Sequence, residues 1–192
     1  MKYFIWRMIH LIVFLIILAG LLLSVVIVPW FSQGEGASNW EGGLLSPYGE
    51  DVYDEDKTYS ELAEDSSGGV EEMFDNLWIG GMVYLILTAF SCLLILVVII
   101  LLICQRHTKV EKIFATVVLV VISLGCQLAG FISWATLSKV DYEEDCEDLV
   151  DGEDPAPVCA EEGSMIALAV LLLLGVATFL HCCLWCCLRR ER

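Results

Sequence analysis

The sequence predicts an all-α membrane protein, a bundle of four transmembrane helices with both termini in the cytoplasm. Apolar residues make up 58% of the 192 residues, and the mean hydropathy is +0.74. An average soluble domain is roughly 45–50% apolar. The apolar residues form four long uncharged runs, and the charged residues gather between them. This pattern excludes a soluble globular domain, a disordered chain and a nucleic-acid-binding protein, which needs a basic surface.

The four apolar runs are the predicted spans of a single membrane domain, residues 1–192. Each holds more than 20 residues, and a helix of about 20 residues crosses the hydrocarbon core of a bilayer. The first run is too long for the apolar region of a signal peptide and no A-x-A site follows it, so we expect it to be retained. Trp30, directly after it, is expected to anchor the helix end at the membrane interface. The runs cover residues 8–28, 77–104, 113–137 and 165–188.

The distribution of basic residues predicts the orientation. Eight of the ten lie in the two termini and the short loop 105–112, whereas the loops 29–76 and 138–164 hold only Lys57 and Lys139. The positive-inside rule therefore places the termini and the short loop in the cytoplasm and the two longer loops outside. All but two of the 26 acidic residues lie in these outer loops. We expect a multi-pass protein of the plasma membrane or a derived membrane.

The first outer loop begins with a Gly- and Ser-rich stretch, which predicts irregular structure. Ser60 is placed to cap one short helical turn. Acidic residues just before the second span suit the positive end of its helix dipole; they are Glu71, Glu72 and Asp75. Because the loop contains no cysteine, we expect it either to pack on neighbouring chains or to be mobile.

The second outer loop contains Cys146 and Cys159. In an oxidising compartment we expect them to form a disulfide, which would add roughly 3 kcal/mol of stability; two free thiols are the alternative. The acidic stretch around them does not fit a calcium-binding loop, since Leu149 and Val158 fall at ligand positions. We expect either a diffuse cation atmosphere at the outer face or a solvated, repulsive surface.

The third span contains two rows of small residues and a central amide. Gly125, Ala129 and Ser133 form one row, and Cys126 and Gly130 form the other. Such rows let helices approach closely. We expect packing inside the four-helix unit, with a dimer face as the alternative. Gln127 is expected to form an interhelical hydrogen bond.

The last span ends in four cysteines followed by arginines; the cysteines are Cys182, Cys183, Cys186 and Cys187. Juxtamembrane cysteines are the usual targets of S-palmitoylation, which is the favoured interpretation. A zinc site through Cys183 and Cys186 and a plain apolar helix end are the alternatives. A continuous helix separates these thiols, which disfavours tetrahedral coordination.

Three short segments and the cysteine-rich tail resemble those of the claudin and peripheral myelin protein superfamily. The segments are Pro29-Trp30, Trp40-Glu-Gly-Gly-Leu and Phe131-Ile-Ser-Trp134. Claudins carry a cysteine pair in the first outer loop. Here the pair lies in the second loop, which is similar to MARVEL-domain proteins such as occludin. The resemblance implies adhesion, barrier formation or service as an auxiliary channel subunit.

No catalytic constellation accompanies the three histidines, His10, His107 and His181, so we expect neither an enzyme nor a bound cofactor or metal. The leading hypothesis is a structural or interaction protein that contacts the bilayer and associates with membrane proteins or its own copies. The alternative is a cation-selective channel subunit with carboxylate rings at its outer mouth. These carboxylates are Glu71, Glu72, Asp75, Asp141, Glu143 and Glu144.

Overall fold

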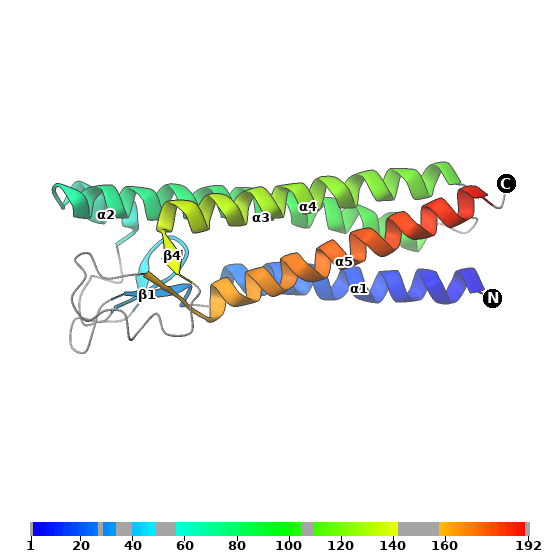
Figure 1. The fold of residues 1–192 in the computed structure, drawn as a ribbon, viewed down its shortest axis with the longest axis horizontal. Helices are drawn as coiled ribbons and strands as arrows, with labels where there is room; N and C mark the ends of the chain where they lie inside the picture. Colours follow the sequence, from blue (N-terminus) through cyan, green and yellow to red (C-terminus); the bar gives the residue numbers. More distant parts are fainter. Residues whose placement is uncertain are drawn as a thin grey trace.

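Four long helices form an elongated bundle in the computed structural model (Figure 1). Around the bundle the packing order is α1, α3, α4 and α5, and α5 packs against α1. Both termini lie at one end, called here the terminal end. The helices are α1 (Lys2–Val26), α3 (Gly69–Cys104), α4 (Val110–Ser138) and α5 (Glu162–Arg190). The structure describes residues 2–26, 29–33, 40–48, 57–104, 110–141 and 158–190.

All four helices are long and apolar enough to cross a membrane, which confirms the four-helix membrane class. Helix α3 has 36 residues. At 1.5 Å per residue it is about 54 Å long, well beyond the roughly 30 Å of a hydrocarbon core. It begins at Gly69, earlier than the predicted span, because Gly68 supplies a left-handed turn (φ 69°). Its first turns therefore extend past the apolar part of the bundle.

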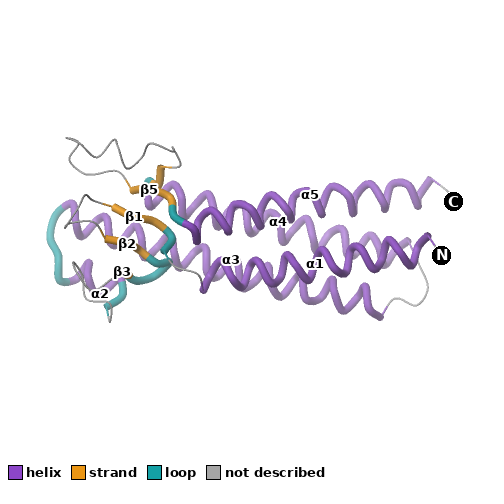
Figure 2. The backbone as a smooth tube through the Cα atoms, turned by 90° about the horizontal axis from the view of Figure 1, so that it is seen from below, coloured by secondary structure: helices purple, strands orange, loops and turns teal. Residues whose placement is uncertain are grey.

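A small five-stranded sheet, absent from the sequence prediction, lies at the opposite end (Figures 1 and 2). The strand order is β3-β2-β1-β5-β4. The central pair joins the two predicted outer loops: β1 is antiparallel to β5, with Ser32 opposite Cys159. The strands are β1 (Phe31–Gln33), β2 (Trp40–Gly42), β3 (Pro47–Tyr48), β4 (Val140–Asp141) and β5 (Val158–Ala160).

A short helix, α2 (Tyr59–Glu64), lies beside the start of α3. Its N-cap is Thr58, so the prediction of Ser60 was wrong. Thr58 has the extended backbone that a cap requires, and it forms a capping box with Glu61, whereas Ser60 lies inside the helix. Hydrogen bonds from the Thr58 backbone and hydroxyl lower the pKa of the Glu61 carboxyl. We call the sheet, α2 and the described residues that connect them the head.

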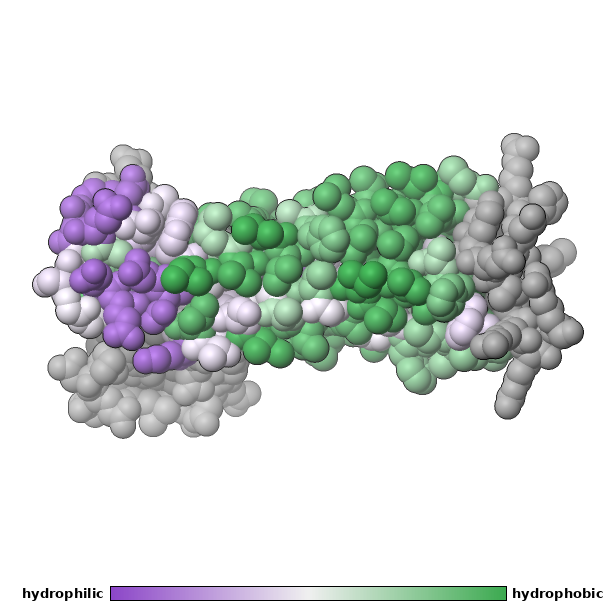
Figure 3. Space-filling model, turned by 90° about the horizontal axis from the view of Figure 1, so that it is seen from above, coloured by the Kyte–Doolittle hydropathy of each residue, from purple (hydrophilic) through white to green (hydrophobic). Residues whose placement is uncertain are grey.

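The buried apolar side chains form two clusters. One joins the head to the near half of the bundle and is rich in aromatic rings, including Trp30, Tyr59 and Trp134. The other, with Phe14 and Leu174 among its members, fills the bundle toward the terminal end. The outside of the bundle is also apolar, with a hydrophilic surface at the head end (Figure 3). This distribution fits helices that contact lipid.

Candidate functional site

Trp30 connects the head to the bundle through packing contacts and a hydrogen bond. Its ring is completely buried between Tyr84 of α3 and Trp134 of α4, at centroid distances of 4.8 and 4.7 Å. Its indole N–H donates to the Ser24 carbonyl at 2.9 Å. The predicted interfacial anchor was therefore wrong, because the ring points into the protein and its polar atom is satisfied by α1.

Backbone hydrogen bonds also link Trp30 to both outer loops. The Trp30 N–H donates to the Gly42 carbonyl, and the Glu161 N–H donates to the Trp30 carbonyl. The Ser32 hydroxyl adds a bond to the Glu161 carboxylate at 2.7 Å. The prediction of a mobile first loop does not hold for its described residues, and packing on neighbouring chains stays a prediction. The loop packs on its own bundle and on the second loop.

The first loop also approaches α3 closely. Leu44 lies against Gly81, where an added Cβ would be only 2.0 Å from the Leu44 carbonyl oxygen. Tyr59 of α2 is buried, and its hydroxyl donates to the Gly43 carbonyl at 3.2 Å. Burial raises the pKa of the Tyr59 phenol well above its usual value. The head is thus fixed to α3 by backbone contact as well as by side chains.

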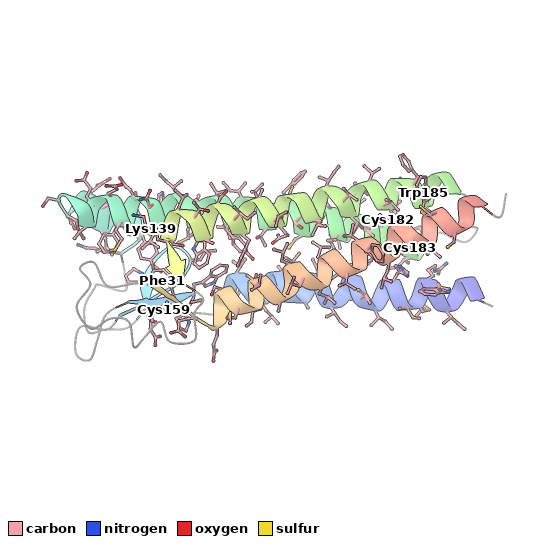
Figure 4. All side chains as sticks on the ribbon, in the orientation of Figure 1. Phe31, Lys139, Cys159, Cys182, Cys183 and Trp185 are labelled. Carbon is pink, nitrogen blue, oxygen red and sulfur yellow. The ribbon has the colours of Figure 1, made fainter. Side chains whose placement is uncertain are left out.

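Cys159 lies in β5, is 7% exposed, and is disulfide-bonded. Figure 4 shows it in the head near Phe31 and Lys139. Cys146, its expected partner, lies outside the described residues.

Replacing Cys159 with serine is expected to lower the free energy of unfolding by about 2–4 kcal/mol, because the unfolded chain loses a cross-link. Thermal unfolding in detergent, with and without reductant, measures the change. The same substitution at Cys126, which is free, is the control. An unfolding midpoint that neither reductant nor Cys159→Ser shifts would contradict the prediction.

The predicted outer-mouth carboxylates are only partly within the described residues. Glu71 and Glu72 lie in the first turn of α3, as the dipole argument predicted, and both are exposed, as is Asp75. Asp141 belongs to β4. Glu143 and Glu144 lie outside the described residues. The structure therefore brings no ring of these residues together in one chain within its described part.

The two rows of small residues on α4 differ in their exposure. Gly130 is buried against Leu87 of α3, where an added Cβ would have neighbours at 3.4 Å and beyond. Gly125 and Ala129 are exposed, and a Cβ on Gly125 would have no contact within 4 Å. Ser133, the third member of their row, is half-buried. The expected internal packing was therefore wrong for Gly125 and Ala129, which face away from the neighbouring helices.

Gln127 does not supply the interhelical bond that was predicted for it. Its side chain is buried, but its amide nitrogen has no hydrogen-bond partner. The hydroxyls of Ser91 and Ser123 form the bond between α3 and α4 instead. Short hydroxyl side chains reach across two closely packed backbones more readily than a longer amide that must find a matching partner.

The tail cysteines lie in the last turns of α5. Figure 4 shows two of them, Cys182 and Cys183, toward the terminal end. Cys183, Cys186 and Cys187 are exposed and Cys182 is half-buried. Cys104, at the end of α3, is also exposed. Within the described residues no group of three or more His, Cys, Asp or Glu side chains is placed to hold a metal ion.

Comparison with known proteins gives no family: no family model matches the sequence, and no curated protein matches it. The functional interpretation therefore depends on the sequence and the structure of this chain. One feature that sequence reasoning missed is the contact between His10 of α1 and His181 of α5, whose ring centroids are 5.0 Å apart. Their separation in sequence hides this contact, and their polar character inside apolar spans was the available signal.

Proposed function

We propose that this multi-pass membrane protein is a non-enzymatic interaction component that associates laterally in the bilayer and presents an acidic head to partners. The observation that carries the proposal is the outward face of α4. Gly125 and Ala129 are exposed there, between exposed apolar side chains such as Leu128 and Ile132. This face offers another helix a close approach that the packing within one chain does not use.

The closed interior of the bundle supports this proposal over transport by a single chain. Aromatic and branched side chains fill both core clusters. Several buried hydroxyls bind one another or a helix backbone: Ser24 contacts the Tyr84 hydroxyl at 3.1 Å, and Ser91 bonds Ser123. Two of the apolar spans, Leu77 to Cys104 and Ile113 to Ser138, contain no Asp, Glu or Lys. Ion pathways through membranes generally use such groups.

The claudin-like segments agree with a role of this kind. Two of the residues that carry the resemblance, Trp30 and Trp134, pack directly on each other, and Phe131 lies beside Trp134. These residues therefore serve to hold the head on the bundle. Adhesion, barrier formation or service as an auxiliary channel subunit, which the resemblance implies, are the roles we propose for this head.

Gly125→Leu is the test of lateral association. The added side chain points away from the chain's own core, so it should leave the fold intact and block close approach along α4. Self-association, measured by energy transfer between labelled copies at varied protein-to-lipid ratios, should weaken by about tenfold, equivalent to about 1.4 kcal/mol. Gly175→Leu is the matched control, because Gly175 of α5 also has no contact within 4 Å at its Cβ position.

Two results would contradict the proposal. The first is self-association that Gly125→Leu and Gly175→Leu change equally. The second is cation flux in liposomes that falls when Glu71, Glu72 and Asp75 become amides. The second result would favour the cation-channel function instead.

We also propose that the tail cysteines are acylated. Cys183, Cys186 and Cys187 are exposed at one helix end, where palmitoyl chains could enter the adjacent leaflet. Acyl exchange on protein from native membranes should add one mass label per acylated thiol. Replacing the four tail cysteines with serine should remove the labels, whereas replacing the half-buried Cys92 and Cys126 should not. Labelling that persists in the tail variant would contradict the assignment.

A further inference from the structure

The contact between α1 and α5 near the terminal end contains two buried imidazoles. His10 is 6% exposed and His181 is 2% exposed. Their ring centroids are 5.0 Å apart, with a 60° angle between the ring planes. Phe14 flanks both rings, at 6.4 Å from His10 and 5.8 Å from His181. The pair is therefore a polar site within an apolar, water-poor part of the bundle.

The hydrogen bonds of the pair determine which nitrogen of each ring carries the proton. His10 Nδ1 lies 2.8 Å from the Trp6 carbonyl oxygen, which can only accept, so Nδ1 is protonated. The Thr116 hydroxyl donates its single proton to the Ile113 carbonyl at 2.8 Å. With the hydroxyl proton on that carbonyl, the Thr116 oxygen accepts from His181 Nε2, which is also 2.8 Å away, and we assign the His181 proton to Nε2 on this basis.

Two bare lone pairs result, on His10 Nε2 and His181 Nδ1. Both atoms are buried and have no hydrogen-bond partner. A buried acceptor without a donor is costly. A metal-binding imidazole characteristically donates its other N–H to a carbonyl or another oxygen, which fixes the tautomer and directs the bare nitrogen at the metal. His10 and His181 both have the outer hydrogen bond of such a ligand, to Trp6 and Thr116 respectively.

We propose that His10 and His181 form a two-imidazole site for Cu(I). Zinc requires about four converging ligands, and the described residues supply no third His, Cys, Asp or Glu. Cu(I) accepts two imidazole nitrogens, and a single positive charge is less costly to bury than two.

The test must separate imidazole from thiolate ligands, because cysteines also bind Cu(I). The full-length protein is therefore prepared with alanine in place of the seven free cysteines among its described residues. It is titrated anaerobically with Cu(I) against a chromophoric Cu(I) chelator. We expect one Cu(I) per chain, and X-ray absorption should show two nitrogen ligands. This spectrum tests the site even if a histidine variant fails to fold.

Variants in the same background locate the site. His10→Gln and His181→Gln should each abolish competition with the chelator, whereas His107→Gln, which removes the remaining histidine, should not. Thr116→Val should weaken Cu(I) binding by about 10–100-fold, because it removes the oxygen that orients His181. Thr178→Val is the matched control, since its hydroxyl bonds only the Leu174 carbonyl on the same helix.

Three results would overturn the proposal. One is a parent protein that fails to compete with the chelator for Cu(I). Another is Cu(I) binding that survives both His10→Gln and His181→Gln. The third is binding of Zn(II) by the same two histidines as tightly as Cu(I), which would contradict a two-coordinate monovalent site.

Discussion

Replacing Trp30 with alanine should lower the free energy of unfolding by about 3–5 kcal/mol, the usual cost of removing a large, completely buried aromatic side chain. The truncation would leave a cavity between Tyr84 and Trp134, which contact opposite sides of the ring. It would also leave the Ser24 carbonyl without the indole N–H that it accepts. Reversible unfolding in mixed micelles of increasing denaturing detergent measures the loss.

Phe179→Ala is the matched control for Trp30→Ala. Phe179 is 67% exposed on the apolar outside of α5, so its removal leaves no internal cavity and should change stability by much less. Amide hydrogen exchange adds a second readout: Trp30→Ala should speed exchange in β1 and β5 more than in the terminal half of α5. Equal losses from both variants would show that Trp30 does not join the head to the bundle.

Gly81→Ala should also lower the free energy of unfolding, by about 1–3 kcal/mol or more. Its Cβ would lie 2.0 Å from the Leu44 carbonyl oxygen and 3.0 Å from Leu45 Cδ2. The carbonyl belongs to the backbone and cannot rotate away, so the first loop must move off α3. Thermal unfolding and protease cleavage of the head should both reveal this shift.

Gly125→Ala is the control for Gly81→Ala. The added methyl meets nothing within 4 Å, and alanine is intrinsically more favourable in a helix than glycine by about 1 kcal/mol. Stability should therefore be unchanged or slightly higher. Similar destabilisation by both substitutions would contradict the close contact between Leu44 and α3, since the loss would then reflect helix flexibility alone.

The four helices were predictable because each apolar residue of a run adds to the evidence for a membrane span. Each apolar run has only one stable location, the bilayer, and inside it only one regular backbone, the helix, which satisfies its own hydrogen bonds. The head carried no comparable signal. Its strands have two or three residues each, too few for an alternating pattern, and their pairing joins segments from two different loops.

The direction of individual side chains was not predictable for a related reason. In a soluble helix polarity separates the buried face from the exposed one, but a membrane helix is apolar toward both its neighbours and the lipid. Sequence alone could not determine that Gly130 faces α3 while Gly125 faces outward. For the same reason the sequence placed Trp30 at the membrane interface, although its ring is completely buried.

The sequence by itself determined the membrane class, the number of spans and the side-by-side position of the tail cysteines, because these depend on local composition and spacing. Only the tertiary structure decided which loop segments pair in the sheet and which face of α4 is open. It also decided that His10 and His181 meet with their bare nitrogens buried. These features depend on contacts between residues far apart in the chain, and such contacts leave no periodic trace in a single sequence.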